Sequence, residues 1–114
     1  MDTNYTEEKF IQAERALTLG MGAIKSRLKD AHRYLLPLAD ADFPEDLKAD
    51  FQWIVQRLNT KVPLRDRWTG DVISGSVSQT LHFMANKTAL TIAERIVYLR
   101  ARLREHNDAH EEHD

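Results

Sequence analysis

Residues 87–106 read KTALTIAERIVYLRARLREH, and this stretch decides the fold. Its apolar side chains recur every three or four residues, which is the period of an α-helix with one buried face. The members of this stripe are Ala89, Ile92, Ile96, Leu99 and Leu103. A single amphipathic helix has to bury its stripe against other elements, so we expect the rest of the chain to supply matching faces.

Four earlier segments show the same period, and we expect helices over about 6–19, 22–36, 44–59 and 76–85 as well as over 87–106. Their apolar faces comprise Phe10, Ala13, Leu17, Leu28, Ala31, Leu35, Leu47, Phe51, Ile54, Leu58, Val77 and Leu81. No segment alternates apolar and polar side chains as a half-buried strand does. The sequence therefore predicts an all-α protein, a compact bundle of four to five helices with no sheet.

Capping residues and glycines mark the ends of these helices. Thr6 is the expected N-cap of the first helix, because its hydroxyl can accept a hydrogen bond from a free N–H group. Gly20 and Gly22 favour a corner between the first two helices, because each glycine costs a helix about 1 kcal/mol relative to alanine. The stretch from Thr60 to Gly75 is the least regular part of the chain and is expected to be a loop.

The domain organisation is simple. The chain has 114 residues, of which 42% are hydrophobic and 30% are charged, and these values are typical of one folded domain. We expect residues 1–105 to form a single helical domain. Residues 106–114 contain no lysine or arginine, and we expect them to be an acidic, histidine-containing frayed tail.

The composition excludes several classes of function. The chain has no cysteine, which rules out disulfides and thiolate metal sites. It has neither the glycine-rich phosphate loop of nucleotide-binding proteins nor a run of about 18 apolar residues that could span a bilayer. Its first residues lack the basic and then apolar profile of a signal peptide. We therefore expect a cytoplasmic protein that uses no cofactor and inserts into no membrane.

Arg27 and His32 are separated by four residues, Leu-Lys-Asp-Ala. This spacing resembles the R-x4-H catalytic motif of the HEPN ribonucleases, which are small helical bundles that often act in pairs. The resemblance implies that Arg27 would stabilise the scissile phosphate and that His32 would act as general acid or base. The position after the arginine is Leu28, where that family tends to have a polar residue. Arg104 and His110 show a similar spacing, so an arginine and a histidine on a helix surface are the alternative interpretation.

His106, His110 and His113 would share one face if the last helix continued through the tail. Neutral imidazoles at this spacing can bind Zn²⁺ or Ni²⁺. Because the tail has no apolar side chain except Ala109 to dock it on a core, most of the binding free energy would be used in ordering it. We therefore expect no metal site, with the three histidines as the weaker alternative.

The loop segment that starts at Lys61 combines basic side chains with an aromatic one. It reads KVPLRDRW, so Arg65, Arg67 and Trp68 follow Lys61 closely. Arginine and tryptophan dominate the energetics of many interfaces, and loops mounted on rigid helices are common binding elements. We predict that these four residues contact a partner. The alternative is that Trp68 packs back onto the bundle and leaves the arginines in solvent.

Residues 57–104 carry nine basic and three acidic side chains, a net charge of +6, although the whole chain has a net charge of -2. Four of the basic residues crowd the last helix, namely Arg95, Arg100, Arg102 and Arg104. We expect them to form a solvated helix face, with the binding of nucleic-acid phosphates as the alternative.

The Arg27/His32 spacing is the only feature that suggests catalysis. We therefore expect a non-enzymatic binding or regulatory module of the adaptor or inhibitor kind, a class that is common among bacterial and phage accessory proteins. A protein partner or an acidic surface is the expected ligand. The alternatives are a nucleic acid bound by the block of residues 57–104, RNA cleavage of the HEPN kind, and association into a homodimer.

Overall fold

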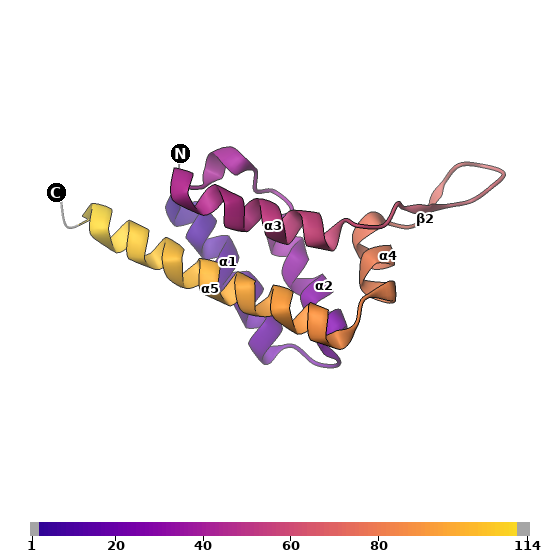
Figure 1. Cartoon of the computed structure of the whole chain (residues 1–114), viewed down its shortest axis with the longest axis horizontal. Coiled ribbons are helices and arrows are strands. Elements are labelled where there is room, and N and C mark those ends of the chain that lie inside the picture. The colour runs from indigo at the N-terminus through magenta and orange to yellow at the C-terminus, as the bar shows by residue number, and fades with distance from the viewer. Residues whose placement is uncertain (1–2, 112–114) are drawn as a thin grey trace.

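The computed structural model describes residues 3–111, which form mainly helices around one core (Figure 1). The helices are α1 (Thr3–Leu19), α2 (Ile24–Leu35), α3 (Lys48–Leu58), α4 (Ser76–Phe83) and α5 (Asn86–Glu111), and two 3-10 turns, η1 (Asp40–Asp42) and η2 (Glu45–Leu47), precede α3. Between α3 and α4 lie two short antiparallel strands, β1 (Leu64–Arg65) and β2 (Val72–Ser74). The predicted all-α bundle is confirmed, with this small two-stranded sheet as the correction to the expectation of no sheet.

The core is made by the stripes that the helical period predicts. Helix α5 lies at its centre and packs against α1, α2 and α3. The side chains of its stripe, Ala89, Ile92, Ile96, Leu99 and Leu103, are all buried. The stripes of α1 and α2 are buried against one another and against α5. Apolar burial at about 25 cal/mol per Å² is the main term that holds such a bundle together.

The linker before α3 closes one side of this core with aromatic side chains. The ring of Phe43 stacks on Phe51 with centroids 4.2 Å apart, and the ring of Phe10 meets Phe43 edge-on at 5.8 Å. The hydroxyl of Thr6 is buried and donates to the carbonyl of Asp42 at 2.8 Å. Thr6 therefore ties α1 to the linker. It is not the N-cap that the sequence suggested, because α1 begins three residues earlier.

The corner between α1 and α2 lies at the expected glycines. A Cβ atom on Gly20 would lie 2.2 Å from the carbonyl oxygen of Ala16, so only glycine fits there without a backbone shift. Gly22 has a φ of 93°, in the left-handed region that favours glycine. Arg27 closes the corner by donating to the carbonyls of Leu17, at 2.7 Å, and Gly22, at 3.1 Å.

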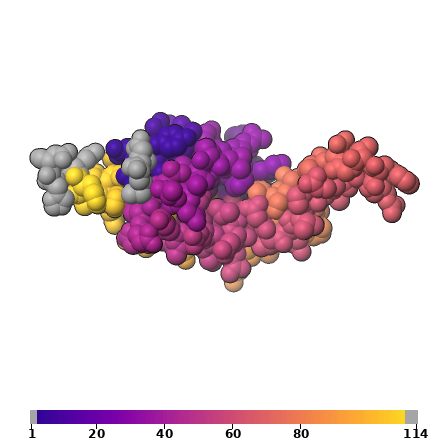
Figure 2. Space-filling view, turned by 90° about the horizontal axis from the view of Figure 1, so that it is seen from above, coloured from indigo at the N-terminus to yellow at the C-terminus, as the bar shows by residue number. Residues whose placement is uncertain are grey.

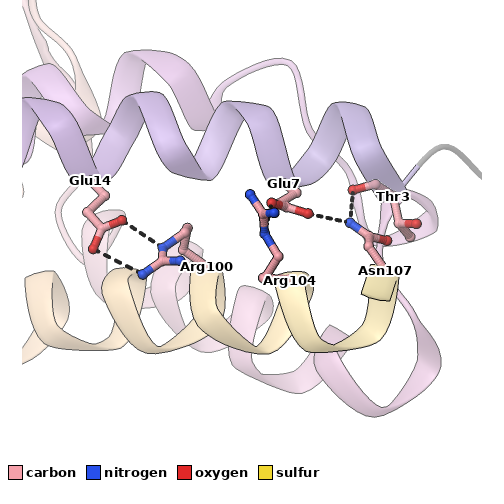
Figure 3. Close-up of polar contacts among 6 residues, drawn as sticks. All are labelled: Thr3, Glu7, Glu14, Arg100, Arg104 and Asn107. Atoms are coloured by element: carbon pink, nitrogen blue, oxygen red, sulfur yellow. Dashed lines mark hydrogen bonds and ion pairs between the residues drawn. The ribbon is translucent and has the colours of Figure 1, made fainter. Parts of the chain in front are cut away.

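Helix α5 runs further than the expected boundary at residue 106. Asn107 is only 6% exposed, because it packs against the first turn of α1 (Figure 3). Its side-chain amide donates to the carbonyl of Thr3 at 3.1 Å and to the carboxylate of Glu7 at 2.7 Å. These hydrogen bonds dock the end of α5 on α1. The sequence did not suggest this docking, because the segment has few apolar residues.

Candidate functional site

Residues 61–75 leave the helical body as a hairpin, here called the arm (Figures 1 and 2). Leu64 pairs with Ser74 and Arg65 with Val72 in an antiparallel register that is irregular between the two pairs. The arm replaces the loop that the sequence predicted. Its strands have only two and three residues, which is too short for alternation to be visible in the sequence.

The base of the arm is anchored on α4. The backbone N–H of Lys61 donates to the hydroxyl of Thr80 at 3.1 Å. The hydroxyl of Ser76 donates to the carbonyl of Lys61 at 2.6 Å. Thr80 is 3% exposed and donates in turn to the carbonyl of Ser76, so the base belongs to the packed part of the fold.

The tip of the arm is a closed turn built around Asp66. Its carboxylate accepts hydrogen bonds from the N–H groups of Thr69 and Trp68, both at 2.8 Å, and these bonds hold the pKa of the Asp66 carboxyl below its usual range. The Asp66 N–H donates to the carbonyl of Asp71 at 2.7 Å. Gly70, with a φ of 77°, donates to the Asp66 carbonyl at 2.9 Å. The turn is therefore ordered by its own hydrogen bonds.

Trp68 lies on this turn and is 88% exposed, so it does not pack back onto the bundle. The guanidinium of Arg67 lies 6.0 Å from the centroid of its indole ring. Arg65 donates to the carbonyl of Gly70 at 3.1 Å, and the ammonium of Lys61 lies 5.5 Å from the ring of Phe83. The structure thus brings Arg65, Arg67 and Trp68 together at the tip and leaves Lys61 at the base.

The apolar side chains of the arm are exposed as well. Val62 is 83% and Ile73 is 64% exposed, and Leu64 and Val72 are about half exposed. Large apolar side chains gathered in this way on one projection are typical of a contact surface. Sequence reasoning missed these four residues, although the D-x-x-x-G turn at residues 66–70 with apolar residues on both sides was the available signal.

The arginines of α5 are paired with acidic residues of other elements. Arg104 contacts the carboxylate of Glu7 at 2.7 Å, and Arg100 contacts Glu14 at 2.7 Å (Figure 3). Arg95 contacts Asp50 at 3.0 Å, and Arg102 contacts Asp46 at 3.6 Å as well as Glu105 of its own helix at 3.4 Å. These cations are therefore paired within the chain, although their side chains remain 29–53% exposed at the surface.

Arg27 and His32 face different parts of the molecule. Arg27 lines a pocket with residues of α1 and α5, and its guanidinium is engaged by the α1–α2 corner. His32 lines a cleft on the other side of α2, together with residues of α3 and α4. Burial in that cleft lowers the pKa of His32. Within one chain, the two side chains share no site.

The histidines of the last helix contact one another. The rings of His106 and His110 have centroids 4.0 Å apart, and Nδ1 of His110 lies 2.8 Å from the carbonyl of His106. His113 lies outside the described residues. Within residues 3–111, no group of three or more histidine, aspartate or glutamate side chains is arranged to hold a metal ion.

A cleft of about 340 Å³ opens beside the base of the arm. It lies between the last turns of α2 and α3 and the start of α4, and among its described lining residues His32 is the only titratable one. Most of the remaining lining is apolar, including Leu36, which is 66% exposed, and Val55. The described helices include none that is long and apolar enough to cross a membrane.

Comparison of the chain with protein families, with curated protein sequences and with solved structures finds no match.

Proposed function

We propose that this chain is a small non-enzymatic binding module that docks onto a protein partner through its arm. The observation that carries the proposal is Trp68, a large aromatic side chain that is almost fully exposed on a turn closed by its own hydrogen bonds. A preformed turn loses little conformational entropy on binding, so more of the contact free energy appears as affinity.

The composition of the arm favours a protein partner. Tryptophan and arginine are the residue types most enriched among those that dominate protein interfaces, and here they lie side by side at the tip. The exposed Val62, Leu64 and Ile73 add apolar area along the arm. A basic and apolar projection of this kind fits an apolar cleft with an acidic rim.

The nucleic-acid and ribonuclease alternatives find less support. Four of the nine basic side chains in residues 57–104 are the arginines of α5, and these form ion pairs with acidic residues of the same chain. The cation of Arg27 holds a helix corner, away from His32. These ion pairs and hydrogen bonds account for the arginines of α5 and for Arg27. They do not account for the exposed side chains of the arm.

Photocrosslinking of the full chain tests this proposal. A photoreactive amino acid at Val72, which is exposed on β2, should form an adduct with a partner in an extract of the source cells. We expect Trp68→Ala to weaken capture about tenfold or more, which corresponds to about 1.4 kcal/mol. Gel mobility and mass spectrometry of the adduct measure both effects.

Met21→Ala is the matched control, because Met21 is 89% exposed but lies in the α1–α2 corner. It removes similar apolar surface away from the arm and should leave the adduct yield unchanged. Equal losses for Trp68→Ala and Met21→Ala, or an adduct that forms equally well from position 21, would contradict docking through the arm.

A further inference from the structure

Two adjoining clefts form one groove along α3. The first, of about 340 Å³, begins at residues 75–78, beside the base of the arm. The second, of about 590 Å³, extends to η1 and is lined by Asp40 and Ala41. Leu38, Phe51 and Val55 line both clefts, so the two lie next to one another along α3.

The groove is an apolar surface that complements the exposed apolar side chains of the arm. Most of the first cleft is lined by apolar side chains of α2 and α3, and Leu36 and Val55 remain exposed at its edge. The volume of the first cleft, about 340 Å³, is at the lower end of the range for pockets that enclose small molecules, and it suits a few inserted side chains. Burying Trp68 or Ile73 there would remove exposed apolar area from both surfaces.

The charges at the far end of the groove complement those of the arm. Within residues 3–111, Asp40 and Asp42 have no ion pair, whereas the neighbouring Glu45 and Asp46 pair with Lys48 and Arg102. Asp42 accepts from the backbone N–H of Ala39 and Asp40 from the side-chain amide of Gln52, so the donors to both carboxylates are neutral groups.

On the arm, none of the described acidic residues forms an ion pair with Lys61, Arg65 or Arg67. Asp66 and Asp71 lie in the same hairpin and leave it with a net charge of +1. The carboxylate of Asp66 is occupied by the two N–H groups of the turn. The arm therefore presents unpaired cations, and η1 presents unpaired anions.

One copy cannot satisfy both surfaces by itself. The arm points away from the helical body, whereas η1 lies near the opposite end of α3 (Figure 1). Eleven residues of α3 separate them by about 16 Å of helix, and the length of the arm adds to that distance. The space-filling view shows the arm as a projection beyond the body (Figure 2).

We infer that the arm of one copy docks in the α3 groove of a second copy, with its apolar side chains over the cleft and its cations near Asp40 and Asp42. This inference rests on the proposed function, because it names the partner of the arm. A reciprocal exchange of arms would give a dimer, and a contact made in one direction only would give a ring or a longer chain. Both arrangements use the same contact.

Charge-swapped variants of the full chain test the contact. The arm variant is Arg65→Glu with Arg67→Glu, and the groove variant is Asp40→Lys with Ala41→Lys. Ala41 is exposed in the second cleft, and neither groove position is in the helical core. Light scattering coupled to size exclusion measures the mass over a range of protein concentrations, and circular dichroism checks that the helices are retained.

We expect the wild-type chain to exceed the monomer mass as its concentration rises, and each variant alone to need about tenfold or more protein for the same association. An equimolar mixture of the two variants should recover association, because the acidic arm then meets the lysine groove while the basic arm meets Asp40. Salt at about 0.5 M should weaken the wild-type contact, because it screens these charges.

Asp30→Lys provides the control for a change of charge alone. Asp30 is exposed on α2, forms none of the ion pairs found in the described chain, and lines neither cleft of the groove. It should associate as the wild type does. Ile73→Ser, which keeps every charge of the arm, should reduce association and so report on the apolar part of the contact.

A wild-type chain that stays monomeric at all concentrations would overturn the inference, as would association that neither the arm nor the groove variant changes. These results are distinguishable from a failure of the proposed function. A monomeric chain whose arm still forms Trp68-dependent adducts with another protein would retain the binding module and reject only the second copy as its partner.

Discussion

Glu7 illustrates how single polar residues organise this bundle. Its side chain is nearly buried between α1 and α5, where it contacts the guanidinium of Arg104 and accepts from the amide of Asn107, each at 2.7 Å (Figure 3). Arg104 is half exposed and can be hydrated if the pair is lost, whereas the Asn107 amide is buried. Removing the Glu7 side chain therefore lowers stability mainly through the lost hydrogen bond to the buried Asn107 amide.

We expect Glu7→Ala to lower the free energy of unfolding by about 1–3 kcal/mol, because it leaves the Asn107 amide short of one buried acceptor. Urea unfolding followed by circular dichroism measures this change. Glu8→Ala removes an exposed carboxylate from the same turn and should change stability by no more than about 0.5 kcal/mol. Similar losses for both variants would show that Glu7 acts only as one more surface charge.

At the scale of elements, the corner between α1 and α2 depends on the absence of a side chain. The Cβ of an alanine at position 20 would meet the Ala16 carbonyl oxygen at 2.2 Å, a backbone contact that cannot give way by a rotamer change. We expect Gly20→Ala to destabilise the fold by about 1–3 kcal/mol, the usual cost of forcing extra volume into a packed region. Thermal and urea unfolding should show this loss.

Gly75→Ala is the comparison for this element. A Cβ there would meet nothing within 4 Å, and Gly75 has the extended φ of -70° that alanine adopts readily. Its stability should be unchanged or higher by up to about 1 kcal/mol, since alanine reduces the freedom of the unfolded chain. If Gly20→Ala were as stable as Gly75→Ala, the close approach at the corner would not constrain the sequence.

The elements also show what the sequence could predict. The stripe of α5, from Ala89 to Leu103, and that of α1, from Phe10 to Leu17, are buried as their period indicates. The arm was not predicted, because two- and three-residue strands carry no readable alternation. The ion pairs of the α5 arginines were also not predictable from the sequence. Arg100 and Glu14 are 86 residues apart, and no local pattern announces such a pair.

The candidate site was predicted in part. Lys61, Arg65, Arg67 and Trp68 were singled out by their residue types, and the structure places them on the arm. The groove could not be anticipated, since its lining comes from α2, the η1 turn, α3 and the start of α4. A surface that depends on how four segments meet has no signature in any one of them.

At the scale of the whole molecule, the arm and the long α5 make the protein elongated. The radius of gyration is 15.4 Å and the extents are 58 × 27 × 19 Å. A compact chain of this length would have a radius of gyration of about 13 Å. The difference arises from parts that project from the core and carry little of its buried apolar surface.

We expect that replacing residues 65–73, the outer part of the arm, by an Asn-Gly turn reduces the radius of gyration toward the compact value. The turn would join Leu64 to Ser74, which pair directly in the antiparallel register. Because none of the removed residues is buried, the free energy of unfolding should change by no more than about 1 kcal/mol. Small-angle X-ray scattering and urea unfolding provide the two readouts, and a large loss of stability would assign the arm to the fold.

The antiparallel contact of α1 with α5 also has a consequence for the order of folding. Asn107 meets Thr3 across 104 residues, so this contact closes almost the whole described chain into one loop. Loops of this length are slow to close, and folding rates fall as contacts become more distant in sequence. Helices α1 and α2, joined by four residues, can pair early. During synthesis α1 therefore meets its second partner only after α5 has been made, and docking of α5 is the step that completes the core of the bundle.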